Sequence, residues 1–435
     1  MSEKRNIGRR NFLKRASLTA FGAPYIVPSS VFGANAPNNR LTLGCIGVGG
    51  MGTHDMQKFL DRSDVQVTAV CDVDTLHRLK AKEIVEKTYA GKQRSGNYRG
   101  CDHYNDFRDI IDRKDIDLVL IATPDHWHAI PAITASNAGK DIYCEKPVSL
   151  TIQQGRAMCD AVRRNGTIWQ TGSWQRSVDQ FRTACELVRN GRIGQLQTIY
   201  IGLPLWDLIN QQPEMPVPEG FDYNFWLGPA PWAPYTEKRC HFNFRWFLDY
   251  AGGLITDWGA HHCDIAHWGM GTDTTGPIEV EGHGQFSEDG FSTVAKSFLV
   301  RCTYENGVIL EVATTDKHKQ GVKFTGDEGW VFVSRKELDT EPKSLQTSVI
   351  GRDEIHLYRS NDHWGNFIDC VRSRKQTITP VEVAHRTITV CHLGNISMLL
   401  KRKIQWDPES ERCVNDPEAD RMLGRSMRSP WSLPA

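Results

Sequence analysis

The sequence predicts an α/β protein of two domains, the first of which is built on a parallel sheet. Its 435 residues are more than one hydrophobic core usually serves. Between residues 41 and 171, short apolar runs alternate with segments of helical periodicity, and such alternation forms parallel sheets with right-handed crossovers. Between residues 195 and 333, several segments alternate apolar and polar side chains, as half-buried antiparallel strands do. We therefore expect a first domain over 37–172 and a second over 173–435.

The individual elements follow from these patterns in chain order. In the first domain the expected strands cover 41–48, 65–71, 118–122, 141–144 and 167–171. The expected helices there cover 107–111, 130–138 and 152–163, with another around residues 56–60. In the second domain we expect strands at 195–201, 278–286, 295–304, 308–315, 322–325 and 329–333, and helices at 363–373 and 383–401. Two late helices leave much of such a sheet uncovered, so we expect a homodimer or homotetramer.

Two segments of the second domain lack periodicity. Residues 205–241 are rich in Pro and Trp, and a loop of that length inside a compact domain is usually functional or disordered. Its aromatic content favours order, as a wall of a substrate cleft. The polar tail from residue 407 to residue 435 is expected to wrap the surface.

The charge balance excludes two classes of partner. The formal net charge is zero, so there is no electrostatic case for binding nucleic acid or an anionic membrane. Residues 1–36 nevertheless hold six basic side chains and one acidic one. The rest of the chain is correspondingly acidic.

That basic segment resembles a bacterial twin-arginine export signal. Arg9 and Arg10 precede a weakly apolar stretch over 16–27, and Ala34-Asn35-Ala36 has the small-x-small pattern of a signal-peptidase site. Gly8 stands where Ser or Thr is common. The alternative is a basic disordered tail. We expect a signal peptide over 1–36 and a periplasmic protein.

A dinucleotide site is predicted at the first strand-to-helix turn, where the sequence reads GVGGMG from Gly47 to Gly52. Gly47 allows the tight turn, Gly49 lets the backbone approach a pyrophosphate, and Gly52 permits close packing of helix on strand. The helix N-terminus then offers free N–H groups and partial positive charge to the phosphates. Met51, in the same turn, is expected to contact the cofactor.

The end of the second strand indicates which cofactor. Asp72 lies twenty residues after Gly52, where a carboxylate accepts hydrogen bonds from both adenosine ribose hydroxyls and repels a 2′-phosphate. NAD is therefore expected rather than NADP.

The combined motifs resemble the Gfo/Idh/MocA oxidoreductases. Besides the glycine turn and Asp72, the chain has Thr123-Pro124 with His128, then Glu145-Lys146-Pro147, and later GGLITDWGAH over 252–261. The resemblance implies a Rossmann domain, then an α/β domain with a large open, mostly antiparallel sheet that often serves as an oligomer interface. It also implies that Thr123, Pro124, His128, Glu145 and Lys146 contribute to the cofactor site.

Three residues are the expected catalytic set. The resemblance implies that Lys146 helps bind the reacting hydroxyl, and a lysine beside a cationic nicotinamide can take part in proton transfer. Asp257 and His261 are four apart on an expected helix and share a face. We expect His261 to be the general base, with Asp257 either orienting its ring or contacting the same substrate. The alternative for Lys146 is a surface ammonium paired with Glu145. The alternative for Asp257 and His261 is a helix-capping pair or a pair satisfied in the core.

Six further residues are candidates for substrate binding. An Arg at the start of the second domain can fork to substrate hydroxyls, and a Trp can stack on a sugar face. The alternative is that these residues only line the domain junction. The candidates are Trp174, Gln175 and Arg176 at that start, and Arg245, Trp246 and His363 by analogy with the family.

No structural metal is expected. His262 and His267 are five apart, off one helical face, and no second Cys/His cluster completes a shell. The twelve cysteines show no C-x-x-C pair. We expect most of them to be small core residues, with room for one or two disulfides.

These features predict an exported oxidoreductase that moves hydride between a sugar, glycoside or cyclitol hydroxyl and a tightly held nicotinamide. An exported enzyme of this kind is expected to keep its nucleotide through turnover. The alternative is an NAD-dependent glycoside hydrolase that works by transient oxidation and elimination. A third hypothesis is a binding or sensor protein that keeps NAD as a structural element.

Overall fold

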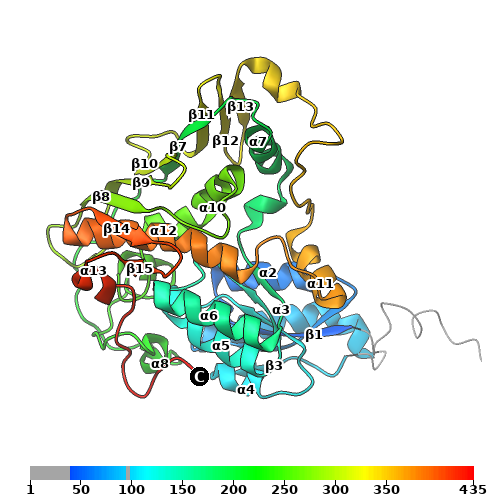
Figure 1. Cartoon of the computed structure of the whole chain (residues 1–435). Coiled ribbons are helices and arrows are strands. Elements are labelled where there is room, and N and C mark those ends of the chain that lie inside the picture. Colours follow the sequence, from blue (N-terminus) through cyan, green and yellow to red (C-terminus); the bar gives the residue numbers. More distant parts are fainter. Residues whose placement is uncertain (1–39, 95–97) are drawn as a thin grey trace, which may run out of the picture. The chain divides into compact units, whose positions relative to one another are not determined.

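A computed structural model describes residues 40–94 and 98–435 (Figure 1). The predicted signal peptide over 1–36 lies outside the described residues, so its prediction stays untested. The described part of the chain forms two sheets with helices packed on them.

The first sheet has six strands in the order β3-β2-β1-β4-β5-β6, all parallel. The strands are β1 (Leu41–Ile46), β2 (Val65–Cys71), β3 (Asp102–Tyr104), β4 (Leu118–Ile121), β5 (Asp141–Cys144) and β6 (Trp169–Thr171). The helices between them are α2 (Gly50–Leu60), α3 (Thr75–Arg94), α4 (Phe107–Ile111), α5 (Ala129–Asn137) and α6 (Ile152–Asn165). The predicted Rossmann topology is confirmed. β3 was missed because its three residues carry no apolar run.

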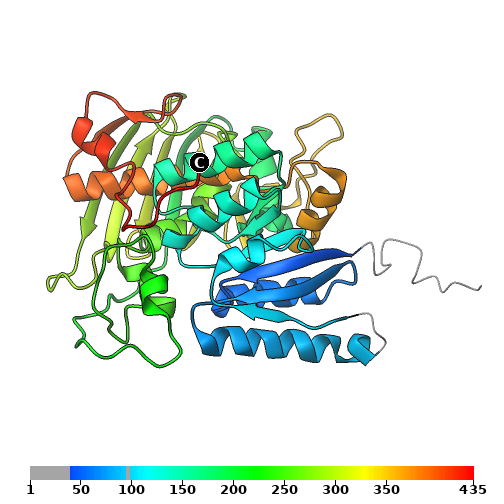
Figure 2. The same cartoon turned by 90° about the horizontal axis from the view of Figure 1, so that it is seen from below.

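Both faces of this sheet are covered, which explains why its strands are continuously apolar. One face buries residues of α2 and α3 together with Phe367 and Ile368 of the later helix α11 (His363–Ser373). The other face buries residues of α4, α5 and α6. Figure 2 shows the sheet between α3 on one side and α5 and α6 on the other.

The second sheet has nine strands in the order β13-β12-β11-β7-β10-β9-β8-β14-β15. Their bounds are β7 (Leu196–Leu203), β8 (Glu279–Gln285), β9 (Ser297–Thr303), β10 (Ile309–Thr314), β11 (Gly321–Gly326), β12 (Trp330–Val333), β13 (Leu338–Glu341), β14 (Ile404–Asp407) and β15 (Arg412–Cys413). Every neighbouring pair is antiparallel except β7 with β10. The predicted large, mostly antiparallel sheet is confirmed.

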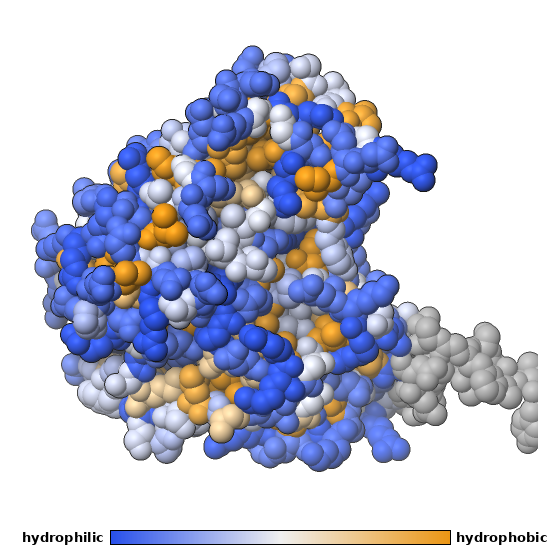
Figure 3. Space-filling model, viewed as in Figure 1, coloured by the Kyte–Doolittle hydropathy of each residue, from blue (hydrophilic) through white to orange (hydrophobic). Residues whose placement is uncertain are grey.

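One face of this sheet is covered by α7 (Asp179–Arg189), α10 (Gly259–Met270) and α12 (Val381–Leu400) (Figure 1). The opposite face carries charged pairs, such as Arg301 with Glu311, and lysines over aromatic rings, such as Lys323 over Trp330. Apolar residues on the molecular face in Figure 3 likewise occur in small separate groups among polar ones.

The tail does more than wrap the surface. β14 ends at Asp407, where the tail begins, and the tail adds β15 beside it at the edge of the second sheet before α13 (Pro417–Arg421) follows. Farther on, the Trp431 ring stacks on Phe225 at 5.4 Å. The expected wrapping is confirmed, but the sheet pairing of β14 and β15 was not predicted, since two short strands show too little alternation.

Between the two sheets lies a buried ion-pair cluster that corrects one prediction. Arg176, in the short helix η4 (Trp174–Ser177), is 3% exposed and bonds both carboxylate oxygens of Asp264 in α10 at 3.0 and 2.9 Å. Its other nitrogens bond Asp273 at 2.7 and 3.1 Å. Arg176 is therefore committed to protein carboxylates and has no donor edge left for a substrate.

All twelve cysteines are buried and unpaired, as expected of small core residues. No helix within residues 40–94 and 98–435 combines the length and apolar character needed to cross a membrane.

We predict that Arg176→Leu lowers the free energy of unfolding by about 3–5 kcal/mol, because it leaves the Asp264 carboxylate buried without a counter-charge. Arg163→Leu is the matched control, since Arg163 pairs with Asp160 while both side chains are more than half exposed. The control should change the free energy by about 0–1 kcal/mol. Chemical denaturation of the two variants measures the difference, and equal losses would contradict the account.

Candidate active site

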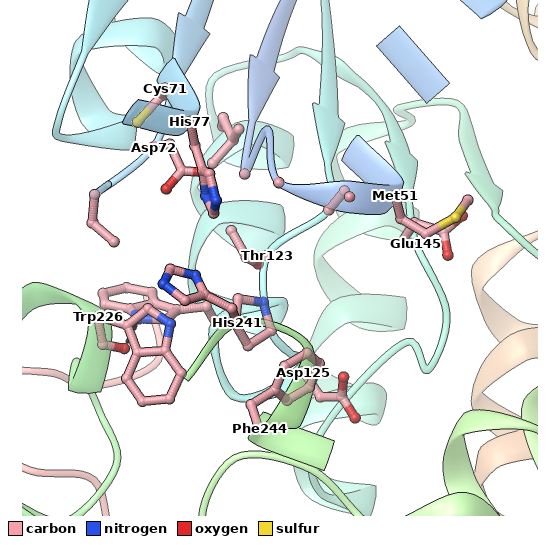
Figure 4. Close-up of a pocket in the computed structure, with 18 of the residues that line it drawn as sticks. Met51, Cys71, Asp72, His77, Thr123, Asp125, Glu145, Trp226, His241 and Phe244 are labelled. Atoms are coloured by element: carbon pink, nitrogen blue, oxygen red, sulfur yellow. Dashed lines mark hydrogen bonds and ion pairs between the residues drawn. The ribbon is translucent and has the colours of Figure 1, made fainter. Parts of the chain in front are cut away.

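A cleft of about 390 Å³ opens at the carboxyl ends of β1, β2, β4 and β5. Parallel sheets bind their ligands at this edge. The other wall comes from the long loop over 205–241, including Phe221, Trp226 and His241, and from Arg245 shortly after it. Figure 4 shows Asp72 and His77 at one end of the cleft, Thr123 midway, and Met51 and Glu145 at the other end. The prediction that the loop walls a cleft is confirmed by these contacts.

The glycine turn fits a dinucleotide. Gly47 has φ +79°, in the left-handed region, and a Cβ on Gly52 would lie 1.8 Å from the carbonyl oxygen of Gly47. A Cβ on Gly50 would meet nothing within 4 Å. The first turn of α2 has no acidic residue and no side-chain cap, so its N–H groups face the cleft free to bind a pyrophosphate.

Asp72 stands where the adenosine ribose would bind. One carboxylate oxygen accepts from the Val48 N–H at 2.9 Å, and the other accepts from the Asp74 N–H at 2.9 Å. These bonds fix the carboxylate at the cleft wall beside the glycine turn. The second-strand acid is thus positioned to accept ribose hydroxyls, as NAD requires.

A strap from the second domain crosses this end of the cleft. Phe221 forms a β-bridge with Asp74, the Asp222 N–H donates to the carbonyl of Val73 at 3.0 Å, and the Thr75 N–H donates to Gly220 at 2.9 Å. These backbone bonds tie residues 220–222 to the segment directly after β2. Any ligand at Asp72 is thereby enclosed from the second-domain side.

Beside the strap lies a group of side chains that the sequence did not reveal. His77 and His241 meet at 4.9 Å between ring centroids, and their nitrogens and an Asp74 oxygen all lie within 4.8 Å of one another. His241 adopts φ +52°, which is rare for a residue with a side chain. Hydrogen bonding to Asp72 raises the pKa of His77. The group sits beside Asp72, at the adenosine end of the cleft.

At the other end, Lys146 and Asp257 form a buried ion pair. The Lys146 ammonium donates to the Asp257 carboxylate at 2.6 Å, and the two side chains are 12% and 9% exposed. Arg245 approaches the same carboxylate at 3.5 Å. Burial alone would raise the pKa of Asp257, but the Lys146 and Arg245 charges outweigh it and hold the pKa below its ordinary value. Lys146 and Arg245 also line the cleft, as predicted for both.

His261 lies close by but is not oriented by Asp257. Asp257 ends α9 (Leu254–Asp257), Trp258 interrupts the helix, and the Asp257 carboxylate points to Lys146 instead. The predicted Asp257–His261 pairing is therefore wrong. The His261 side chain has no hydrogen bond to any described residue, and its Nδ1 is buried. Burial, and then the Lys146 charge, lower the pKa of His261 well below its ordinary value, so the ring is a neutral proton acceptor.

Three buried acids near the ion pair hold protons more tightly than usual. Burial raises the pKa of Asp125 to about 8, although Arg245 opposes the rise. Burial raises the pKa of Glu145 to about 7 against the Lys146 charge. Glu145 shares a hydrogen bond with Asp55 of α2, whose pKa burial and the Glu145 charge both raise. Asp125 and Asp55 were not among the predicted site residues.

His128 holds the Thr123-Pro124 turn from its buried side. Both residues of the turn line the cleft, whereas His128 is 1% exposed. Its ring nitrogens lie 2.7 Å from the carbonyl of Pro147 and 2.8 Å from that of Thr123. Burial lowers the pKa of His128 to about 4, so the neutral ring donates to one of them. His128 positions the turn rather than contacting a cofactor.

The remaining substrate candidates have different environments. Gln175 is fully buried and accepts from Arg335 at 2.9 Å, while Trp174 lies 6.3 Å from the His261 ring. Trp246 packs on Trp206 at 6.0 Å. His363 is 2% exposed, with its nitrogens on Thr171 and Ser177 at 2.9 and 3.0 Å.

The expected substrate contacts of Trp246 and His363 are therefore corrected to packing and positioning roles. Analogy with the family indicated which positions of the sequence lie near the pocket, but it could not indicate whether their side chains are exposed to it. The His262 and His267 side chains have different partners: His267 bonds Tyr304 at 2.6 Å, and His262 faces Gln175 at 3.3 Å.

Comparison with known proteins places both halves of the chain in one family. The family described as "Oxidoreductase family, NAD-binding Rossmann fold" matches residues 41–173, and "Oxidoreductase family, C-terminal alpha/beta domain" matches residues 195–433. These are the two parts of the Gfo/Idh/MocA family.

Individual relatives resemble this chain over only part of their length or at low sequence identity. A glycosyl hydrolase family 109 protein of Shewanella pealeana is 29% identical over 224 residues, which cover 46% of this chain and 48% of the relative. The chain thus spans about half the length of that curated relative.

Two solved structures share the fold. The WlbA dehydrogenase of Bordetella pertussis, in complex with NADH and UDP-GlcNAcA, has a TM-score of 0.60 at 14% identity and covers 85% of this chain and 99% of that one. The myo-inositol 2-dehydrogenase of Lactobacillus plantarum has a TM-score of 0.57 at 18% identity, with 84% and 99% covered.

We predict that the His261 ring titrates well below the ordinary histidine pKa of about 6.5, so that it stays neutral as the pH falls through that value. Burial and the nearby Lys146 charge disfavour the imidazolium. Nitrogen chemical shifts of the ring, assigned with His261→Gln, measure this. A titration midpoint near the ordinary pKa would show that the ring is solvated.

Proposed function

Because this chain belongs to the Gfo/Idh/MocA family of oxidoreductases, we propose that it oxidises a hydroxyl of a sugar, glycoside or cyclitol with NAD. The observation that carries the proposal is the Lys146–Asp257 ion pair at the cleft end opposite Asp72. A dinucleotide whose ribose meets Asp72 and whose pyrophosphate meets the glycine turn would extend toward Lys146.

The chain's own residues supply proton handling and orientation. When bound, NAD supplies the acceptor for the hydride that leaves the substrate carbon. The Lys146 ammonium donates a hydrogen bond to the reacting hydroxyl oxygen and is held in place by Asp257. The hydroxyl proton passes to the neutral His261 ring, since its side chain is free to accept one. The products are a ketone, reduced nicotinamide and one proton on the protein.

Two features support a nucleotide that stays bound. The strap from Gly220 to Asp222 covers the adenosine end of the cleft. A twin-arginine leader over 1–36 would export the folded protein with its cofactor to the periplasm. Both favour a cycle in which the reduced nicotinamide passes its hydride to a second carbonyl compound rather than leaving the enzyme.

The second candidate is an NAD-dependent glycoside hydrolase, favoured by the similarity to the glycosyl hydrolase family 109 protein of Shewanella pealeana. Oxidation of a hydroxyl to a ketone acidifies the neighbouring C–H bond, and loss of that proton with elimination expels the aglycone. Water then adds to the resulting double bond, and return of the hydride to the ketone leaves no net redox change. The same Lys146 and cofactor serve both reactions. Aglycone released without accumulation of reduced nicotinamide would select the hydrolase.

Assembly is also proposed. The uncovered face of the second sheet spans charged and aromatic side chains, including Arg301, Glu311 and Lys323. A second copy of the chain on that face would form a homodimer, and two such pairs a homotetramer.

We predict that Lys146→Met lowers turnover about 10²- to 10⁴-fold, the usual contribution of a positioned acid–base group, while the bound nucleotide remains. The Lys146 ammonium bonds Asp257 rather than the glycine turn, so nucleotide binding does not depend on it. Lys87→Met is the control, because its side chain is 74% exposed and pairs only with Glu83 on the surface.

The two readouts are mass spectrometry of nucleotide released on denaturation and reduction of the nicotinamide by a panel of glycosides and cyclitols. Near-stoichiometric NAD(H) in all three proteins, with turnover lost in Lys146→Met alone, supports the proposal. Unchanged turnover in that variant would contradict it, and would favour a protein that keeps NAD as a structural element.

A further inference from the structure

One exposed arginine of the second sheet contacts the tryptophans that surround His261. Arg335 lies in the turn between β12 and β13, and its Nε donates to the buried Gln175 side chain at 2.9 Å. Its guanidinium carbon lies 4.5 Å from the ring centroid of Trp174 and 4.5 Å from that of Trp258. Gln175 is itself fixed against His262 at 3.3 Å. The Arg335 head is therefore held in one place by three buried or half-buried neighbours.

The outer edge of this guanidinium is open. Among the described residues, Arg335 forms no ion pair, and only its Nε has a hydrogen-bond partner. Its two terminal nitrogens thus present a planar pair of donors that no protein acceptor uses. Held arginines of this kind usually face a carboxylate that bonds both nitrogens, since a guanidinium is always charged and its fork matches that group.

The same two indoles connect Arg335 to the reacting centre. The ring centroids of Trp174 and Trp258 lie 6.3 and 6.1 Å from that of His261. The Arg335 charge also acts on His261, whose pKa it lowers, and on Asp257. A sugar whose reacting hydroxyl meets Lys146 would therefore extend over these indoles toward Arg335.

The charge balance around this position favours an anion. Lys146, Arg245 and Arg335 are cations, and Asp257 is the carboxylate that the first two share. Asp125 does not compensate, because burial raises its pKa to about 8 and keeps it protonated at neutral pH. Glu145, whose pKa burial raises to about 7, adds a partial negative charge beside Lys146. Three cations thus face one full and one partial carboxylate charge, and an anionic substrate would complete this balance.

We propose that Arg335 binds the carboxylate of an acidic sugar, so that the substrate class of this site is a uronic acid or its glycoside. This inference rests on the proposed function for the reaction itself, but it makes a separate claim about binding. A carboxylate is favoured over a hydroxyl because it uses both free nitrogens at once. It is favoured over a phosphate because the free edge is a planar pair of donors that matches a planar carboxylate.

The test compares matched pairs of methyl glycosides that differ only at the last carbon, such as methyl glucuronide and methyl glucoside, with galacto and manno pairs. The full-length, nucleotide-loaded enzyme is assayed for nicotinamide reduction and, by calorimetry, for binding of each compound. Arg335→Gln removes the charge, Arg335→Lys keeps it without the fork, and Lys336→Gln is the control for the same turn. Lys336 is exposed and its side chain has no partner among the described residues.

The expected result is at least a tenfold preference in kcat/KM for the uronide of one pair. Arg335→Gln removes that preference chiefly by raising KM for the uronide, Arg335→Lys restores part of it, and Lys336→Gln keeps it. Equal use of both members, a preference for the neutral sugar or for a sugar phosphate, or equal losses on both members in Arg335→Gln would overturn the inference.

Binding separates this inference from the proposed function. If no compound reduces the nucleotide, yet a uronide binds and Arg335→Gln abolishes its binding, the inference stands and the dehydrogenase proposal fails. If neutral glycosides are oxidised and uronides neither bind nor react, the reverse holds. Absence of uronide binding to the wild-type protein overturns the inference in either case.

Discussion

The Lys146–Asp257 ion pair is the interaction on which the site depends. Lys146 follows the fifth strand of the first sheet, whereas Asp257 ends a helix of the second domain, so their contact at 2.6 Å fixes one domain against the other. Both side chains are buried, and loss of either partner would leave an uncompensated charge. The pair holds an ammonium at the cleft end opposite Asp72. Arg245 shares the carboxylate and helps to keep Asp257 ionised, whereas burial raises the pKa of Asp125 to about 8 and that of Glu145 to about 7.

The nucleotide end was largely predictable from the sequence because its chemistry is local. Gly47, Gly49, Gly52 and Asp72 act through backbone conformation, close packing and a strand end, all of which follow from nearby residues. The structure places them as expected. The strap from Gly220 to Asp222 was not predicted in detail, since its pairing with the segment after β2 joins residues about 150 positions apart without any shared pattern.

The substrate end was less predictable, because burial and long-range pairing decide what each polar residue does. Arg176 and Arg335 look alike in sequence, yet Arg176 is saturated by two carboxylates and Arg335 keeps an open edge. Asp257 and His261 have helical spacing, but the break at Trp258 and the pull of Lys146 turn the carboxylate away from the imidazole. Arg335 lies in a short hairpin turn of the second sheet, and the residues next to it in the sequence form no motif that indicates a ligand site.

The central claim is that a substrate C–H hydrogen passes to the bound nicotinamide beside Lys146. The most direct measurement uses glycosides whose carbon-bound hydrogens are replaced by deuterium. The enzyme is denatured during the first half-reaction, with no second carbonyl compound present, and the released nucleotide is analysed by mass spectrometry. One deuterium should appear on the nicotinamide ring, and it should appear about 10²- to 10⁴-fold more slowly in Lys146→Met. Conversion of the substrate with an unlabelled nucleotide would contradict it, because the cofactor would then take no part in breaking the C–H bond.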